Sequence, residues 1–261
     1  MSVLSYIEYV ASKLELSYDE KVSIKTSIST LVTRLENYDK CGDILDKYMF
    51  GSFDRGTILP RSYDRDSDVD YMVVFKEPFK VQPQSRLNWL KRFSEEKYSR
   101  SEIHQDYPTI ALELNHIRFE LVPAVEMGNS YNLQIPAPRS SYLQWINTNP
   151  SEQARITEDA DRRTKGVFRK LVRIMKYWNI KNGRIYSSYQ LEQSLSKLVY
   201  FGENLEDLFY YAVKYLPTIG LSDTERGKVD ELKNKVETVK RLHDSGLEPL
   251  ADLLIRQIIP M

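Results

Sequence analysis

The sequence GSFDRGT at residues 51–57 and the sequence DVDYMVVF at residues 68–75 decide the fold. The first begins with a glycine and a small hydroxyl residue, a pair that lets a backbone turn approach a bulky anion closely. In the second, two aspartates lead into an uninterrupted apolar run, which is typical of a strand buried on both faces. Residues 48–50 predict a short strand before the turn. We therefore expect a turn between two strands, with acids at the start of the second.

The two aspartates carry the clearest chemistry. Residues two apart on a strand point to the same side, so Asp68 and Asp70 would present their carboxylates together. Carboxylate oxygens are hard ligands that suit magnesium, and Gly51 and Ser52 suit a triphosphate. The pattern predicts metal-dependent nucleotidyl transfer, in which two magnesium ions stabilise the attacking and departing oxygens. The alternative is that the aspartates only flank a loop, because residues 64–67 are polar as well.

A third acid follows in a predicted hairpin at residues 109–125, where apolar residues alternate with polar ones. If residues 115–116 form a two-residue turn, Glu113 lies opposite Arg118. Glu120 then has no neutralising neighbour across the hairpin and is the freer acid. It could complete the metal site and help the acceptor hydroxyl to lose its proton. The alternative is that Glu120 pairs with Arg118 or is an ordinary exposed strand acid.

Composition limits the function classes. The 261 residues include 37 basic and 37 acidic side chains, so no overall field attracts nucleic acid or an acidic membrane. The lone Cys41 cannot form an internal disulfide, and the sequence contains neither a signal sequence nor a membrane-spanning run. We expect a cytoplasmic protein without membrane contact.

The order of the elements favours two lobes. Residues 17–20 have capping-box spacing at the start of a helix, and residues 83–98 predict a surface helix. Strand signals nearly vanish after Pro138, and helical patterns dominate from about residue 153 to residue 258. We therefore predict an α+β fold with a core lobe at residues 1–145, including the amino-terminal helices, and a helical lobe at residues 146–261.

The helical lobe has two patterns of its own. A predicted helix carries a stripe of basic residues, Lys165, Arg169, Arg173 and Lys176. The stripe could bind phosphate or could be a solvated helix face, and the spacing alone does not separate these interpretations. Residues 187–192 predict the start of another helix, whose amide groups could bind phosphate. The alternative there is an ordinary helix cap.

Taken together, the motifs resemble a known family. They are GSFDRGT at 51–57, DVD at 68–70, ELVP at 120–123, RIMKYWN at 173–179 and SYQLE at 188–192. In this order they resemble the polymerase-beta-like nucleotidyltransferases. More narrowly, they resemble the CD-NTases of CBASS antiphage defence, which are bacterial relatives of cyclic GMP-AMP synthase and oligoadenylate synthase. The resemblance covers about residues 45–200 and implies a mixed sheet with flanking helices, packed on a helical carboxyl-terminal lobe with the active-site cleft between them.

The resemblance also implies the role of each site residue. Catalysis and metal binding would belong to Asp68, Asp70 and Glu120, and nucleotide binding to Gly51, Ser52, Lys176, Ser188 and Tyr189. Lys176 and Ser188 would contact the terminal phosphates of the donor, and Tyr189 would lie close to its base. The implied cofactor is a pair of Mg²⁺ ions, with Mn²⁺ as an alternative. Many relatives carry aspartate where this chain has Glu120, whose longer side chain can still reach a metal.

The predicted function is the joining of ribonucleoside triphosphates, ATP among them, without a nucleic-acid template. The product would be a cyclic or short linear second messenger that a separate effector protein detects, and we expect the enzyme to be a monomer. One alternative is transfer of a nucleotide to tRNA or protein, as in CCA-adding enzymes and nucleotidyltransferase toxins. Zero net charge and the lack of an obvious tRNA domain argue against it. The other is a catalytically silent nucleotide-binding module, against which the presence of all three acids argues.

Overall fold

The structure is a computed structural model that describes residues 2–39, 42–76, 81–126, 133–139, 141–202 and 204–261. Cys41 lies outside these residues. The chain divides into a sheet unit, Leu16–Arg61 with Arg65–Ala154, and a helical unit, Met1–Glu15 with Ser62–Asp64 and Arg155–Met261. The predicted domain division at residues 145 and 146 stays a prediction.

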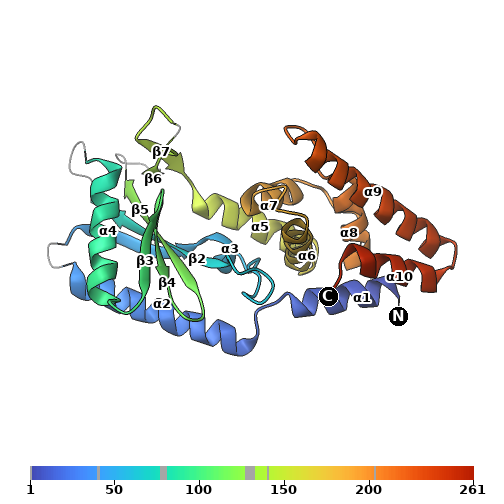
Figure 1. Ribbon diagram of the computed structural model, residues 1–261, viewed down its shortest axis with the longest axis horizontal. Coiled ribbons are helices and arrows are strands. Elements are labelled where there is room, and N and C mark those ends of the chain that lie inside the picture. Colours follow the sequence, from blue (N-terminus) through green and yellow to red (C-terminus); the bar gives the residue numbers. More distant parts are fainter. Residues whose placement is uncertain (1, 40–41, 77–80, 127–132, 140, 203) are drawn as a thin grey trace. The chain divides into compact units, whose positions relative to one another are not determined.

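The sheet unit is built on a mixed seven-stranded sheet (Figure 1). Its strands are β1 (Ile44–Phe50), β2 (Asp68–Phe75), β3 (Glu102–Asp106), β4 (Thr109–Glu113), β5 (Arg118–Glu126), β6 (Leu133–Pro136) and β7 (Trp145–Thr148). The main path runs β1-β2-β5-β4-β3, and β6 joins β5 and β7. Strands β2 and β5 are parallel, whereas the other pairs are antiparallel.

Two helices, α2 (Tyr18–Tyr38) and α4 (Pro83–Lys97), cover one face of this sheet (Figure 1). Alternate residues of β2, such as Val69 and Val73, point into that core, because side chains on a strand alternate between faces. Met72 and Val74 point to the opposite face. The two aspartates of β2 share the parity of this second set, so they lie on the face away from α2 and α4.

Several helices begin at a residue whose side chain caps the first turn. Helix α2 starts with the predicted capping box, in which the Ser17 side chain accepts from Glu20 N and the Glu20 carboxylate accepts from Ser17 N. Ser187 and Ser222 cap α7 and α9 in the same way. The helices other than α2 and α4 are α1 (Val3–Lys13), α3 (Gly51–Asp54), α5 (Pro150–Arg163), α6 (Phe168–Lys181), α7 (Ser188–Ser196), α8 (Leu205–Lys214), α9 (Asp223–Asp244) and α10 (Glu248–Ile258).

Most predicted elements are confirmed. The hairpin turn lies at residues 115–116, where Leu114 N donates to Ile117 O at 2.9 Å. The strand predicted at residues 48–50 is longer, because Ile44 to Lys47 also pair with β2. Strands β3, β6 and β7 were not expected, although the β7 sequence WINT is rich in strand-forming residues. None of the helices that the structure describes has the length and hydrophobicity needed to cross a membrane.

Candidate active site

The three predicted acids come together on two neighbouring strands. Asp68 and Asp70 are the first and third residues of β2, and Glu120 is the third residue of β5. In the parallel register Asp70 is the partner of Glu120, and Asp68 is the partner of Arg118. The sheet therefore places the three carboxylates together at the amino-terminal ends of β2 and β5.

The pKa of Glu120 reflects this crowding. Burial raises the pKa of Glu120, and the nearby Arg118 guanidinium lowers it. The Asp70 carboxylate raises it again, whereas a side-chain hydrogen bond with Asp68 lowers it. Because both aspartates act on Glu120, the acids form one electrostatic cluster that favours a cation.

Arg118 supplies a cation to this cluster, and the expectation that Glu120 is the freer acid is wrong. Arg118 Nη2 lies 2.9 Å from Glu120 Oε1 and 2.8 Å from Asp106 Oδ2. Its Nε lies 3.7 Å from Glu113 Oε1, so the predicted cross-strand partner is the more distant one. The signal was available in the sequence, because Arg118 and Glu120 are two residues apart on a strand and share a face.

We expect Arg118→Gln to destabilise the protein more at neutral than at acidic pH. Loss of the guanidinium raises the pKa of the buried Glu120 further, and a carboxyl with a raised folded-state pKa costs stability only once the pH exceeds its unfolded value. The expected loss is about 2 kcal/mol at pH 7 and much less near pH 4. Urea denaturation at the two pH values measures it. Arg92→Gln, on the exposed side of α4, is the control, and an equal loss at both pH values would contradict the assignment.

The acid cluster has suitable donors for a divalent cation, but it is not a closed metal cage. Its ligands would be carboxylate oxygens, which magnesium and manganese prefer. Among the residues that the structure describes, no three His, Cys, Asp or Glu side chains form a ready metal site. One oxygen of Glu120 lies 2.9 Å from Arg118 Nη2.

The glycine of the first motif packs directly against the acids. Gly51 has φ +77°, a left-handed conformation that other residues rarely adopt, and a Cβ there would lie 1.7 Å from Asp70 Oδ2. The turn after it is closed on Ser52 O, which accepts from Thr57 N at 2.9 Å and Ile58 N at 3.1 Å. Gly51 and Ser52 are thus held beside the acid cluster, as the sequence predicts.

The other predicted nucleotide-binding residues belong to the helical unit. Lys176 of α6 is 4 % exposed and its Nζ lies 3.1 Å from Glu192 Oε2, on α7. The other Glu192 oxygen accepts from Thr157 Oγ1 at 3.1 Å. By contrast, Ser188 and Tyr189 are exposed on the first turn of α7. The carboxylate partner of Lys176 could not be found from spacing, because Glu192 is not on the same helix.

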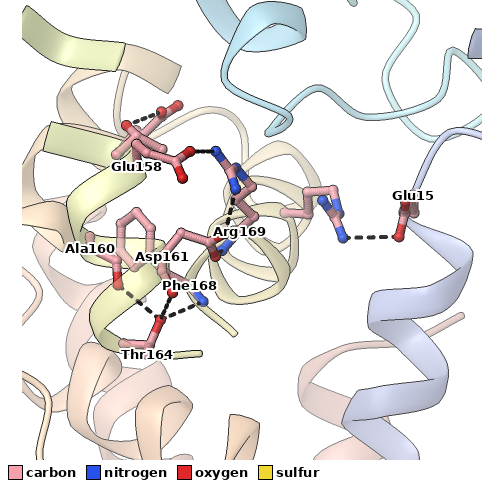
Figure 2. Close-up of polar contacts among 10 residues, drawn as sticks. Glu15, Glu158, Ala160, Asp161, Thr164, Phe168 and Arg169 are labelled. Atoms are coloured by element: carbon pink, nitrogen blue, oxygen red, sulfur yellow. Dashed lines mark hydrogen bonds and ion pairs between the residues drawn. The ribbon is translucent and has the colours of Figure 1, made fainter. Parts of the chain in front are cut away.

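The basic stripe is not a solvated helix face. Lys165 lies outside α6, with φ 54°, so it is not part of the helix that the spacing predicted. Arg169 forms ion pairs with Glu158 and Asp161 (Figure 2). Arg173 Nη2 lies 3.4 Å from Glu15 Oε2, and burial lowers the pKa of Arg173.

Hydrogen bonds at the corner between α5 and α6 hold this network in place (Figure 2). Thr164 Oγ1 donates to Ala160 O at 2.9 Å and accepts from Phe168 N at 3.0 Å, at the start of α6. Asp161 Oδ1 accepts from Arg169 N at 3.1 Å. The orientation of α6, and with it of Lys176, is therefore fixed within the helical unit.

We expect Lys176→Ala to cost about 3 kcal/mol in the free energy of unfolding, because it leaves the buried Glu192 carboxylate without its cation. Lys197→Ala, an exposed position just after α7, should change it by less than about 0.5 kcal/mol. Chemical denaturation measures both. Replacing both partners, in Lys176→Met/Glu192→Leu, should recover much of the loss, and a double variant as unstable as Lys176→Ala would contradict this account.

Comparison with known proteins identifies the family. Residues 1–160 match the family described as the Second Messenger Oligonucleotide or Dinucleotide Synthetase domain. A Bacillus cereus VD146 protein named "Probable cyclic nucleotide synthase" is 23 % identical over 273 residues, which span 89 % of this chain and 77 % of that protein.

Solved structures show the same fold. CdnC of E. coli MS115-1 with ATP superposes with a TM-score of 0.74 at 14 % identity, covering 100 % of this chain and 98 % of that one. Vibrio cholerae DncV, a cyclic AMP-GMP synthase in complex with the linear intermediate pppA(3′,5′)pG, gives 0.73 at 14 % identity and covers 96 % and 93 %. The predicted mixed sheet with flanking helices is thus confirmed.

Proposed function

The chain belongs to the Second Messenger Oligonucleotide or Dinucleotide Synthetase family, and from this we propose that it joins ribonucleoside triphosphates into a cyclic or short linear oligonucleotide. It is a nucleotidyltransferase that needs no template and releases pyrophosphate. The observation that carries the proposal is the placement of Asp68, Asp70 and Glu120 beside Gly51, at one edge of the sheet. A silent binding module would have no need to keep this acid cluster.

Enzymes of this family depend on divalent metal ions, and we propose that two Mg²⁺ ions serve here, with Mn²⁺ as an alternative. Asp68 and Asp70 would bind these ions. Glu120 would also bind one of them when its carboxylate contacts both the metal ion and Arg118. The bound ions would supply charge stabilisation for the triphosphate and the attacking hydroxyl. The backbone at Gly51 and Ser52 would hold the phosphates close to the acids.

We also propose that the helical unit contributes to donor binding. Ser188 and Tyr189 are exposed on the first turn of α7, where amide groups favour phosphate and an aromatic ring can contact a base. Lys176 is the proposed phosphate ligand on α6, and its Glu192 partner would keep the ammonium group positively charged and in one orientation.

One assay tests the proposal. Purified protein is incubated with the four ribonucleoside triphosphates and Mg²⁺, and the products are analysed by mass spectrometry. Cyclic or short linear oligonucleotides with release of pyrophosphate are the expected result. Labelled tRNA or protein in a parallel reaction would instead support transfer to a macromolecule, and unchanged triphosphates would support a silent module.

The biological role follows from the product. We propose that the oligonucleotide is a second messenger in antiphage defence, read by a separate effector protein, and that the enzyme acts as a monomer. Size-exclusion chromatography with light scattering tests the oligomeric state. Extracts of infected cells, with and without the gene, show whether the product forms during infection.

A further inference from the structure

A polar cavity lies in the sheet unit, and none of the predicted active-site residues lines it. Its volume is about 400 Å³. The lining comes from α2, from the carboxyl-terminal end of α4 with the segment after it, and from Leu114. It contains three basic side chains, Arg34, Lys97 and Arg100, together with five hydroxyl groups and no acidic residue. In a chain with zero net charge, this is a local concentration of hydrogen-bond donors.

The three cations are not neutralised within the protein. Among the residues that the structure describes, no acidic side chain forms an ion pair with Arg34, Lys97 or Arg100. Arg34 instead donates to Lys97 O at 2.7 Å and stacks 4.2 Å from the ring centroid of Tyr98. Lys97 Nζ lies 5.6 Å from the ring centroid of Tyr38. The positive charges are positioned by neutral groups and remain available to an anion.

Tyr98 adds a second observation. Its side chain is 8 % exposed, and its buried hydroxyl has no acceptor in the part of the chain that the structure describes. The guanidinium of Arg34 above the ring can only donate, so it does not satisfy the hydroxyl proton. A buried donor without an acceptor costs about 1–3 kcal/mol. Because this hydroxyl is closed to solvent, recognition of a ligand would depend on the three cations and the other four hydroxyl groups of the lining.

We propose that this cavity binds a small phosphate-bearing anion, of the size of pyrophosphate or tripolyphosphate. Arginine, lysine and hydroxyl donors without a competing carboxylate are the chemistry that recognises phosphate oxygens. The volume matches a small ligand. Because Arg34 covers the Tyr98 ring, the cavity has no free aromatic face on which a nucleobase could stack, which favours phosphate groups over a strand of nucleic acid.

Calorimetry with the full-length protein tests the proposal. Sodium phosphate, pyrophosphate and tripolyphosphate are titrated in chloride buffer with EDTA and without nucleotides, so that the acid cluster has no metal with which to bind them. This arrangement makes the result independent of the proposed synthetase activity. We expect binding that strengthens with the number of phosphates, because each adds oxygen acceptors for the donors of the cavity.

The decisive variant is Lys97→Gln/Arg100→Gln, at the end of α4 and just after it. Its control is Lys91→Gln/Arg92→Gln within α4, which removes the same charge away from the cavity. Each charged hydrogen bond is worth about 1.5–3 kcal/mol, so the first should weaken tripolyphosphate binding about tenfold or more and the second by less than about twofold. Circular dichroism confirms folding. If the double variant does not fold, the exposed Arg100→Gln alone should still weaken binding about tenfold.

Titrations with ATP and with an RNA oligonucleotide complete the test. ATP binding tighter than tripolyphosphate would identify a nucleotide tail as the source of the phosphate, and equal affinity would identify a free oligophosphate. No binding of any small anion, equal weakening in the two double variants, or binding of an RNA oligonucleotide without the small anions would overturn the proposal.

Discussion

Replacing Asp68 and Asp70 together with asparagine lowers turnover about a thousandfold or more while the fold stays intact. The substitution keeps the volume of both side chains and removes the negative charges that would hold the metal ions. Metal ions contribute several kcal/mol of charge stabilisation in such a reaction, which corresponds to this factor in rate. Removal of like charge from the crowded cluster around Glu120 should not destabilise the protein. The rate of pyrophosphate release from ribonucleoside triphosphates measures the effect.

The matched control is Asp46→Asn/Glu102→Gln, which removes two exposed acids of the same unit. Its turnover should stay within about twofold of the parent, because neither residue belongs to the cluster. Thermal unfolding establishes that both double variants are folded. If the Asp68 and Asp70 variant kept parental turnover, neither residue could be a metal ligand.

Gly51→Ala should reduce turnover at least about a hundredfold. The new methyl group would lie 1.7 Å from Asp70 Oδ2, so either the turn or the carboxylate must move by more than an ångström. Displacements of this size at a reacting centre cost about a hundredfold in rate. The left-handed backbone conformation adds about 1–2 kcal/mol of strain.

Gly42→Ala separates the two effects. Gly42 has φ +65°, so alanine meets the same backbone strain, but its Cβ would lie 3.7 Å from Lys76 Nζ, an ordinary contact. The control should lose only the stability that backbone strain costs, about 1–2 kcal/mol, and keep its turnover. Measuring unfolding and turnover for both proteins tests this, and similar turnover losses would show that strain alone accounts for the Gly51 result.

Local sequence signals predicted four of the seven strands of the sheet unit, β1, β2, β4 and β5. The strand with the two aspartates, the hairpin register and the capping box at Ser17 depend on periodicity and turn chemistry within a few residues. Glu120 was proposed as the third acid from the hairpin pattern, and the family resemblance implied the same role. Its pairing with Asp70 was not predicted, because parallel pairing of distant strands leaves no local signal.

Partners of buried charges were harder to predict. The sequence placed Arg118 with Glu113, but the structure adds Glu120 and Asp106, because one guanidinium can serve several acceptors. The ion pair between Lys176 and Glu192 joins two helices and depends on their packing. Spacing identified the basic residues of the stripe. It did not show whether their side chains contact solvent or carboxylates.

Side chains of β2 alternate between the hydrophobic core and the acid cluster, so the same strand register serves both folding and catalysis. Val69 and Val73 face the core under α2 and α4, and the aspartates face the other side. A one-residue shift in the register of β2 would exchange the two faces. It would bury the carboxylates among apolar side chains and expose the valines. Insertions or deletions of one residue within β2 or β5 should therefore not be tolerated. A chain that preserves its hydrophobic core thereby preserves the geometry of its acids.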